Sequence, residues 1–250
     1  MDATRHAHSG QTETAGVPEA PGGAAAEASA AEASAAEASA AQASAAQAGG
    51  ASLDEATVDG DPLAQFSRWM ADAVAVPLPE PTAMVLATVS ASGRPRARTV
   101  LLKSYDAGGF TFYTNRTSRK ASDLAEVPRA CLLFPWHPMY RQVIIEGPVT
   151  ALSTEQSEPY FRSRPRGSQL AAWASRQSSV ISSRGELEDR YAALAARWPE
   201  GSPVPMPDFW GGYRVVPEIF EFWSGRPDRM HDRLRYRQED GRWLIERLAP

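Results

Sequence analysis

The sequence predicts a mainly β protein of the α+β class, in which an antiparallel barrel carries flanking helices. Short apolar runs recur between residues 83 and 152, and turn sequences such as SASGRP and DAGG separate several of them. Apolar residues at helical spacing occur before and after these runs. Short strands joined by tight turns favour antiparallel pairing and closure of the sheet into a barrel.

The first 60 residues differ in composition from the rest of the chain. They contain nine acidic residues and one arginine, and residues 26–46 repeat the pentapeptide AEASA. On a helix of about 3.6 residues per turn, a five-residue repeat spirals round the axis and leaves no apolar stripe to bury. We therefore expect a disordered low-complexity tail over residues 1–60 and one folded domain over residues 61–250.

The folded domain is expected to begin with a helix. Asp61 and Pro62 suit its N-cap and first turn. The apolar residues that follow at helical spacing are Leu63, Phe66, Trp69, Met70 and Val74. Strands are expected at residues 83–90, 97–105, 109–115, 129–136, 141–152, 214–223, 233–238 and 242–248. Further helices are expected at residues 118–126, 153–175 and 183–198, the last with a capping box of Ser183 and Glu186.

Charge and cysteine content limit the classes of function. Residues 61–250 contain 25 basic and 21 acidic residues, a net charge of +4, which is well below that of a dedicated nucleic-acid-binding domain. Cys131 is the only cysteine, so no intrachain disulfide can form. The sequence has neither a secretory h-region nor the run of about 20 apolar residues that spans a bilayer. We expect a soluble, cytoplasmic protein that binds small anions rather than nucleic acid or membrane.

The sequence lacks the common catalytic motifs. Of its four histidines, His6, His8, His137 and His231, none stands at metal-ligand spacing with a cysteine or a carboxylate pair, so we expect no metal site. No GxSxG elbow, P-loop or GxGxxG fingerprint occurs. The remaining candidates are clusters of cations.

The two lysines stand out in a chain that contains 24 arginines. Lys103 ends the predicted strand RTVLLK, and Lys120 follows Arg119 at the start of a predicted helix. A helix start favours phosphate through its free N–H groups and its dipole, and an ammonium beside a guanidinium adds point-charge and bidentate contacts. These positions indicate a phosphate site; the alternative is a pair of solvated surface lysines.

Two further clusters could bind anions. In YFRSRPRGSQ, the residues Tyr160, Arg164 and Ser168 recur every four positions, which on one helix would place a phenol, a guanidinium and a hydroxyl on the same face. The alternative is an exposed, basic helix start. The segment RPDRMHDR, residues 226–233, has three arginines and one histidine. The alternative interpretation of this segment is a surface loop without a binding role.

Taken together, these segments resemble the pyridoxine/pyridoxamine 5'-phosphate oxidase family. The motifs cover residues 61–250 in order: DPLAQFSRW, PTAMVLATVS, RTVLLK, FYTN, SRKA, LLFPWH, RQV, SRPRGSQ, AWASRQSS, FWGGYRV, EFW, RMHDR and ERLAP. The resemblance implies an FMN-binding split β-barrel that forms a homodimer, with FMN at the subunit interface. It also implies oxidation of pyridoxamine or pyridoxine 5'-phosphate to pyridoxal 5'-phosphate in vitamin B6 metabolism. Dioxygen would accept the electrons and give hydrogen peroxide, and the amine substrate would release ammonia.

Position in these motifs implies the role of each site residue. FMN would be bound by Arg98, Thr99, Val100, Leu101, Leu102, Lys103, Tyr113, Thr114, Arg119, Lys120, Gln142, Gln177, Ser178, Trp223 and Arg233, some of them from the second subunit. The substrate phosphate would be bound by Lys103, Tyr160, Arg164 and Ser168. The catalytic pair Arg229 and His231 would pack against the pyridine ring of the substrate and orient it for hydride loss.

Two features depart from the family pattern. Met230 stands where leucine is usual, which is a volume-conserving change. No tyrosine precedes Tyr105, so the arginine and tyrosine lid that many members have near the N-terminus cannot form in the usual way. The missing lid leaves open a carrier of flavin or pyridoxal phosphate on the same barrel. Related split barrels that oxidise other ring systems leave open an oxidase with another substrate.

Overall fold

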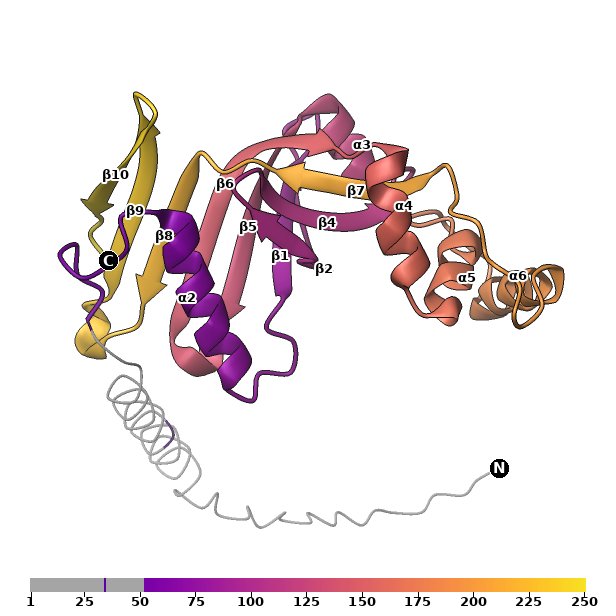
Figure 1. Cartoon of the computed structure of the whole chain (residues 1–250), viewed down its shortest axis with the longest axis horizontal. Coiled ribbons are helices and arrows are strands. Elements are labelled where there is room, and N and C mark those ends of the chain that lie inside the picture. The colour runs from indigo at the N-terminus through magenta and orange to yellow at the C-terminus, as the bar shows by residue number, and fades with distance from the viewer. Residues whose placement is uncertain (1–33, 35–51) are drawn as a thin grey trace, which may run out of the picture. The chain divides into compact units, whose positions relative to one another are not determined.

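The computed structural model describes Ser34 and residues 52–250 (Figure 1). The disordered tail expected over residues 1–60 lies mostly outside the described residues. Its described part packs against the domain: Leu53 is 5% exposed and belongs to the main core. Arg247 donates a hydrogen bond to the carbonyl oxygen of Leu53 and forms an ion pair with Glu55 at 2.6 Å. Packed residues therefore occur ahead of the expected boundary at residue 61.

The described domain is built on one antiparallel sheet of ten strands. Its main path runs β10-β9-β8-β6-β5-β1-β2, and β7 pairs with both β4 and β6. The strands are β1 (Ala83–Val89), β2 (Pro95–Leu101), β3 (Ser104–Asp106), β4 (Gly109–Asn115), β5 (Arg129–Trp136), β6 (Arg141–Ala151), β7 (Trp210–Val215), β8 (Ile219–Ser224), β9 (Asp232–Glu239) and β10 (Arg242–Arg247). The helices beside them are α2 (Pro62–Ala75), α3 (Arg119–Glu126), α4 (Thr154–Ser163), α5 (Arg166–Ala174) and α6 (Arg184–Arg197). This confirms the expected mainly β, antiparallel fold with flanking helices.

Strand β6 joins the two parts of the sheet. Its first residues pair with β5 and β8, and its last residues, from Val149 onward, pair with β7. Gly147 lies just before the change of partner, where a Cβ atom would stand 1.8 Å from the carbonyl oxygen of Val216. Only glycine allows two backbones to approach so closely. Because of this glycine, one strand can pair along two different edges.

Helix α2 crosses one face of the sheet and closes the main core (Figure 1). The carboxylate of Asp61 accepts a hydrogen bond from the backbone N–H of Leu63 at 3.0 Å, so the predicted N-cap is confirmed. The fully buried ring of Phe66 meets the rings of Phe110 and Phe134 edge-on, with centroids 4.9 and 5.1 Å away. Edge-to-face contacts of this kind are the favoured packing of aromatic rings.

A smaller core lies beneath the helical end of the domain and consists of Phe161, Leu170, Val204 and Trp210.

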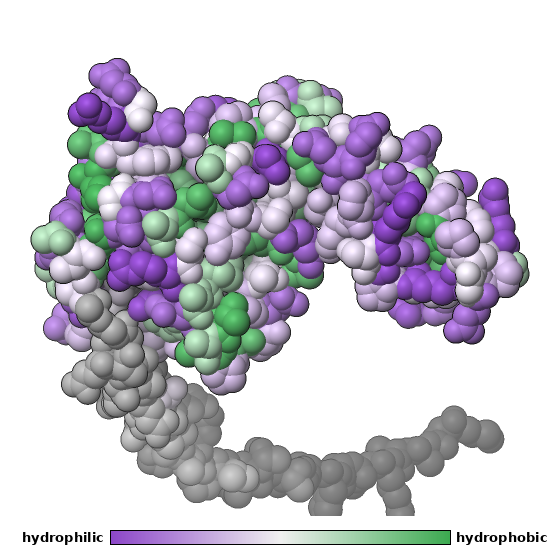
Figure 2. All heavy atoms as spheres, viewed as in Figure 1, coloured by the Kyte–Doolittle hydropathy of each residue, from purple (hydrophilic) through white to green (hydrophobic). Residues whose placement is uncertain are grey.

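Hydrophilic residues cover α5 and α6, whereas hydrophobic side chains reach the surface at the carboxyl end of α2 (Figure 2), where Val74 is 62% exposed. Among the described residues, no helix combines the length and the apolar character that a membrane span requires.

Three expected elements are each divided in two. The expected helix over residues 153–175 is wrong, because it breaks at Arg164 and Pro165 into α4 and α5. A residue before proline favours extended backbone, and Arg164 has φ −70° and ψ 147°. The expected strands over residues 97–105 and 214–223 are also wrong as single strands. In both, the chain changes its partners part-way: β2 pairs with β1 but β3 with β4, and β7 pairs with β4 and β6 but β8 with β6 and β9.

Candidate functional site

Four cationic side chains line one pocket of about 390 Å³, which we call the four-cation pocket. Two of them come from β2, where alternate residues point to the same side of the strand. The other two come from the first turn of α3. The lining consists of Arg96, Ala97, Arg98, Arg119, Lys120 and Ser178. A concentration of like charges in a concave site favours the binding of an anion.

Lys120 is the most buried cation of this pocket, at 9% exposure. Its Nζ donates hydrogen bonds to Oγ1 of Thr114 at 3.1 Å and to Oε1 of Gln177 at 2.6 Å. Burial, with the charge of Arg98 as a smaller cause, lowers the pKa of Lys120 to about 8. An anion in the pocket would favour the charged ammonium and raise that pKa again.

The segment that contains Gln177 and Ser178 docks on the start of α3. The hydroxyl of Ser178 accepts a hydrogen bond from the backbone N–H of Arg119 at 3.2 Å, and the hydroxyl of Thr114 donates to Oε1 of Gln177 at 3.0 Å. Ser178 has φ 74°, in the left-handed region that serine rarely adopts. Five of the residues expected to bind FMN, including Lys120, are thus neighbours within one chain.

A second group, which we call the stacked cluster, combines three aromatic rings with two cations. The ring of Tyr113 stacks on Tyr160 at 4.2 Å between centroids and on Trp210 at 5.3 Å. Nζ of Lys103 lies 5.9 Å from the centroid of the Tyr160 ring, and Cζ of Arg164 lies 5.0 Å from that of Trp210. Both cations are within the range of a cation–π contact.

Arg164 has an unused hydrogen-bond donor in this cluster. Its buried Nη1 has no hydrogen-bond partner among the described residues, and burial lowers the pKa of its guanidinium. A buried charge without a partner is costly, which favours an anionic ligand at this point. The expected common helix face of Tyr160, Arg164 and Ser168 is wrong, because the helix break at Pro165 places Ser168 on α5.

A third group, which we call the loop group, lies around β8 and β9. Gln142, Trp223 and Arg233 are neighbours across β6, β8 and β9. The ring of His231 lies 4.8 Å from that of Trp223. Its Nδ1 accepts a hydrogen bond from the backbone N–H of Arg226 at 3.0 Å, so a neutral imidazole carries its proton on Nε2.

The two expected arginines of the loop group, Arg229 and Arg233, differ in their surroundings. Arg229 is exposed in a turn and has φ 60°. Arg233 forms an ion pair with both carboxylate oxygens of Glu221, at 2.8 and 3.0 Å, and donates to the carbonyl oxygen of Ala249. These contacts fix the guanidinium of Arg233 beside Trp223.

The expected contacts in RTVLLK continue from Arg98. Thr99, Val100 and Leu101 lie on β2, and Leu102 is buried in the main core at 4% exposure. Sequence reasoning did not select Arg96 for the site. Its position two residues before Arg98 on a predicted strand could have indicated Arg96, because alternate side chains of a strand lie on one face.

The loop group and the stacked cluster lie at opposite ends of β6. Tyr113 pairs with Gly212, next to Tyr213, which pairs with Ala151 at the carboxyl end of the strand. Gln142 lies near its amino end. Nine residues of strand at about 3.3 Å each separate the two positions by about 30 Å. A small ligand that contacts both groups therefore needs a second copy of the chain.

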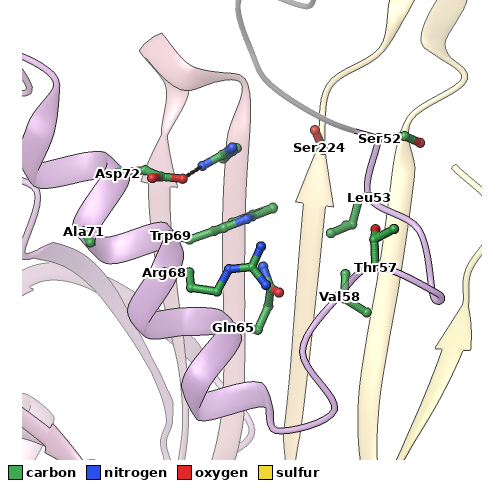
Figure 3. A pocket seen from close by; sticks show the side chains of 11 residues that line it. Ser52, Leu53, Thr57, Val58, Gln65, Arg68, Trp69, Ala71, Asp72 and Ser224 are labelled. Carbon is green, nitrogen blue, oxygen red and sulfur yellow. Dashed lines mark hydrogen bonds and ion pairs between the residues drawn. The ribbon is translucent and has the colours of Figure 1, made fainter.

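Another pocket, of about 460 Å³, contains none of the expected site residues. Gln65, Arg68 and Trp69 project from α2 toward residues 52–58 (Figure 3). Arg141 closes one side through a cation–π contact to Trp69 and an ion pair with α2.

In the part of the chain that the structure describes, no three His, Cys, Asp or Glu side chains gather as a metal site would require.

Two sequence profiles match the chain. One, described as pyridoxamine 5'-phosphate oxidase, matches residues 70–197, and the other, described as the pyridoxine 5'-phosphate oxidase C-terminal dimerisation region, matches residues 210–250. The chain belongs to the pyridoxamine 5'-phosphate oxidase family. The family expected from the motifs is thereby confirmed.

Relatives named pyridoxine/pyridoxamine 5'-phosphate oxidase are similar to this chain over most of its length. The protein of Streptomyces avermitilis is 54% identical over 203 residues, which cover 79% of this chain and 91% of the relative. The protein of Acidothermus cellulolyticus is 56% identical over 202 residues, with 79% and 90% covered.

Two proteins of known crystal structure share the fold. PhzG from Burkholderia lata 383, in complex with tetrahydrophenazine-1-carboxylic acid, has a TM-score of 0.75 and 31% identity, with 80% of this chain and 98% of that chain covered. A pyridoxamine 5'-phosphate oxidase-related, FMN-binding protein from Nostoc punctiforme has a TM-score of 0.60 and 17% identity, with 75% and 96% covered. These likenesses confirm the expected split barrel.

Proposed function

We propose that this chain is an FMN-dependent oxidase that converts pyridoxamine 5'-phosphate and pyridoxine 5'-phosphate to pyridoxal 5'-phosphate. Dioxygen accepts the electrons and yields hydrogen peroxide, and the amine substrate also yields ammonia. The observation that carries the proposal is the presence of two cationic sites, the four-cation pocket and the half-buried Arg164, in a chain whose relatives bear the oxidase name. FMN and the substrate each carry one phosphate ester, so the two reactants together supply one phosphate for each cationic site.

The four-cation pocket fits the phosphate of FMN. Its charge suits a dianion, and it combines the buried ammonium of Lys120 with the exposed hydroxyl of Ser178 at the start of α3. We assign to this cofactor all of residues 98–103, together with Tyr113, Thr114, Arg119, Lys120, Gln177 and Ser178. When bound, the flavin supplies the acceptor for the hydride that leaves the substrate.

The stacked cluster fits the phosphate of the substrate. Lys103, Tyr160 and Arg164 would bind it, and the unused donor of Arg164 is the strongest support for that role. Ser168, at the start of α5, would add a hydroxyl from the other side of the helix break. Fixing the phosphate restricts the position of the reacting carbon, which is the main contribution a protein can make to hydride transfer.

The loop group would complete the site from a second subunit. Gln142, Trp223 and Arg233 would contact FMN, while Arg229 and His231 would orient the pyridine ring. With Nδ1 already occupied, the Nε2–H group of His231 remains free to donate a hydrogen bond to the ligand. The match to a dimerisation region and the separation of the groups along β6 both support a homodimer.

A second candidate function is the oxidation of another ring system. The likeness to PhzG, whose crystal structure holds tetrahydrophenazine-1-carboxylic acid, favours it. The cations of the stacked cluster favour a phosphorylated substrate instead. A carrier on the same barrel would bind FMN or pyridoxal phosphate without turnover.

One assay separates these functions. The FMN-loaded chain is incubated under air with each phosphorylated substrate, with the unphosphorylated amine and with a reduced tricyclic acid, while pyridoxal phosphate and peroxide are measured. We expect product from both phosphorylated substrates and little from the unphosphorylated amine. Absence of pyridoxal phosphate from both would overturn the proposal; turnover of the tricyclic acid alone would favour the second candidate, and no peroxide from any compound would favour the carrier.

A further inference from the structure

We propose that Arg96, positioned by the buried carboxylate of Asp123, is an additional contact of the phosphate in the four-cation pocket and strengthens the preference of this chain for phosphorylated flavin. The inference rests on the proposed function, because it assigns a further residue to the FMN phosphate. Neither residue belongs to the motifs that carry the resemblance to the family.

Arg96 faces the same pocket as the expected contact Arg98. Both side chains project from one face of β2 and line the pocket, with 31% and 22% of the side chain exposed. Of the five donors of the Arg96 guanidinium, only Nη1 has a hydrogen-bond partner among the described residues. The others are available to a ligand, in the planar arrangement that suits the oxygens of a phosphate.

Asp123 lies beneath the pocket and has 2% of its side chain exposed. It is one turn after Arg119 on α3, on the helix face that packs against β1. Its Oδ1 accepts a hydrogen bond from Nη1 of Arg96, and its Oδ2 accepts from the hydroxyl of Thr88 at 2.8 Å. The same Oδ2 is 3.9 Å from Nη2 of Arg98. One carboxylate thus connects both arginines of β2.

The charges in this network act on one another. Burial lowers the pKa of Arg98, the charge of Asp123 opposes this shift, and the charge of Arg96 adds to it. Asp123 therefore offsets part of the repulsion between the two guanidinium groups. A carboxylate this deeply buried is stable only with such partners, so it fixes their orientation before a ligand arrives.

The pocket with Asp123 has four positive charges and one negative charge. A phosphate monoester carries a charge of about −1.5 to −2 at neutral pH, so the excess of cations persists after it binds. Arg98 already donates to the carbonyl oxygen of Leu86 at 3.0 Å and to Thr88 at 2.7 Å. Arg96 is consequently the arginine of β2 with more donors left for a phosphate.

The test compares FMN with riboflavin, which lacks the phosphate. The full chain is freed of flavin and titrated with each compound while quenching of flavin fluorescence is followed. We expect Arg96→Ala to weaken FMN binding about tenfold and to change riboflavin binding by less than about twofold. Arg96→Lys should recover part of the loss, because it restores the charge without the planar fork. The matched control is Arg94→Ala, which removes an exposed arginine outside the pocket and should alter neither affinity.

The positioning role of Asp123 is tested in a second background. If Asp123 acts through Arg96, then Arg96→Ala should cost much less FMN affinity in Asp123→Asn than in the unchanged chain. An equal cost in both backgrounds would refute the positioning role. A preference for FMN over riboflavin that is as large in Arg96→Ala as in the unchanged chain would refute the contact, whereas failure of the unchanged chain to bind either flavin would overturn the proposed function itself.

Discussion

We expect the buried ammonium of Lys120 to make FMN binding depend on pH. In the empty pocket its pKa is about 8, so above pH 8 the side chain is mostly neutral. A bound phosphate favours the charged form, so binding above pH 8 takes up a proton and the affinity falls as the pH rises. We expect level FMN affinity between about pH 7 and pH 8, where the phosphate is mostly a dianion, and a decrease of at most about tenfold per pH unit above pH 8.

Fluorescence titration on either side of pH 8 measures this dependence. Arg98 also faces Lys120 but stays protonated throughout, and the contacts from Thr114 and Gln177 do not titrate. The Lys120→Met variant should bind FMN more weakly at neutral pH, and its affinity should not fall as the pH rises above 8. If the affinity of this variant fell as much as that of the unchanged chain, another group would be responsible for the dependence.

Arg164 should control the use of phosphorylated substrates. Because its buried Nη1 has no partner in the described structure, we expect Arg164→Leu to lower kcat/KM for pyridoxamine 5'-phosphate about a hundredfold, mostly through KM. FMN content should not change. The matched control is Arg162→Leu in the last turn of α4, whose side chain is 73% exposed and pairs with Glu158. Equal steady-state constants for the two variants would remove Arg164 from the substrate site.

At the scale of residues, the motifs selected most residues of the proposed site but not the residue that supports two of its arginines. Lys103, Lys120 and Arg164 could be selected because their types and positions are distinctive. Asp123 could not, because it is one polar residue in a short helical pattern, and only the packing of α3 on β1 shows that its carboxylate is buried beneath two arginines. The grouping of Tyr160 with Ser168 on one helix face was wrong because Pro165 ends the helix.

At the scale of elements, Gly147 determines whether β6 can pair along both edges. A Cβ at this position would collide with the carbonyl oxygen of Val216 at 1.8 Å, and backbone cannot move aside as a side chain can. We expect Gly147→Ala to lower the free energy of unfolding by about 3 kcal/mol. Urea denaturation measures the change. Gly60→Ala, where no atom lies within 4 Å of the added Cβ, should unfold like the unchanged chain.

The elements themselves could largely be predicted from local pattern, whereas their partners could not. The short apolar runs of β1 and β5 made these strands recognisable in the sequence. The divisions between β2 and β3 and between β7 and β8 were missed, because residues on both sides of each division are equally strand-like. What changes there is the neighbouring strand, which depends on residues far away in the chain.

At the scale of the whole molecule, each site should combine residues of two subunits. Arg164→Leu and Arg229→Leu alter groups at opposite ends of β6, so a mixed dimer should contain one site with both changes and one with neither. Random assembly of the two inactive variants should then restore about a quarter of the original activity. Activity at low substrate concentration after coexpression measures this. Lys103→Met with Arg164→Leu, both in the stacked cluster, should show no rescue; rescue there, or none in the first pair, would contradict the arrangement.

The four-cation pocket presents charge and hydrogen-bond donors to any small tetrahedral anion, and the free ions of a laboratory buffer have the same chemistry as the ester of a flavin. Inorganic phosphate or sulfate used during purification would compete for the pocket and strip the yellow cofactor from the protein. A zwitterionic buffer at low ionic strength is therefore the suitable medium in which to isolate this chain, and colour retained there but lost in phosphate would be an early sign of where the flavin is anchored.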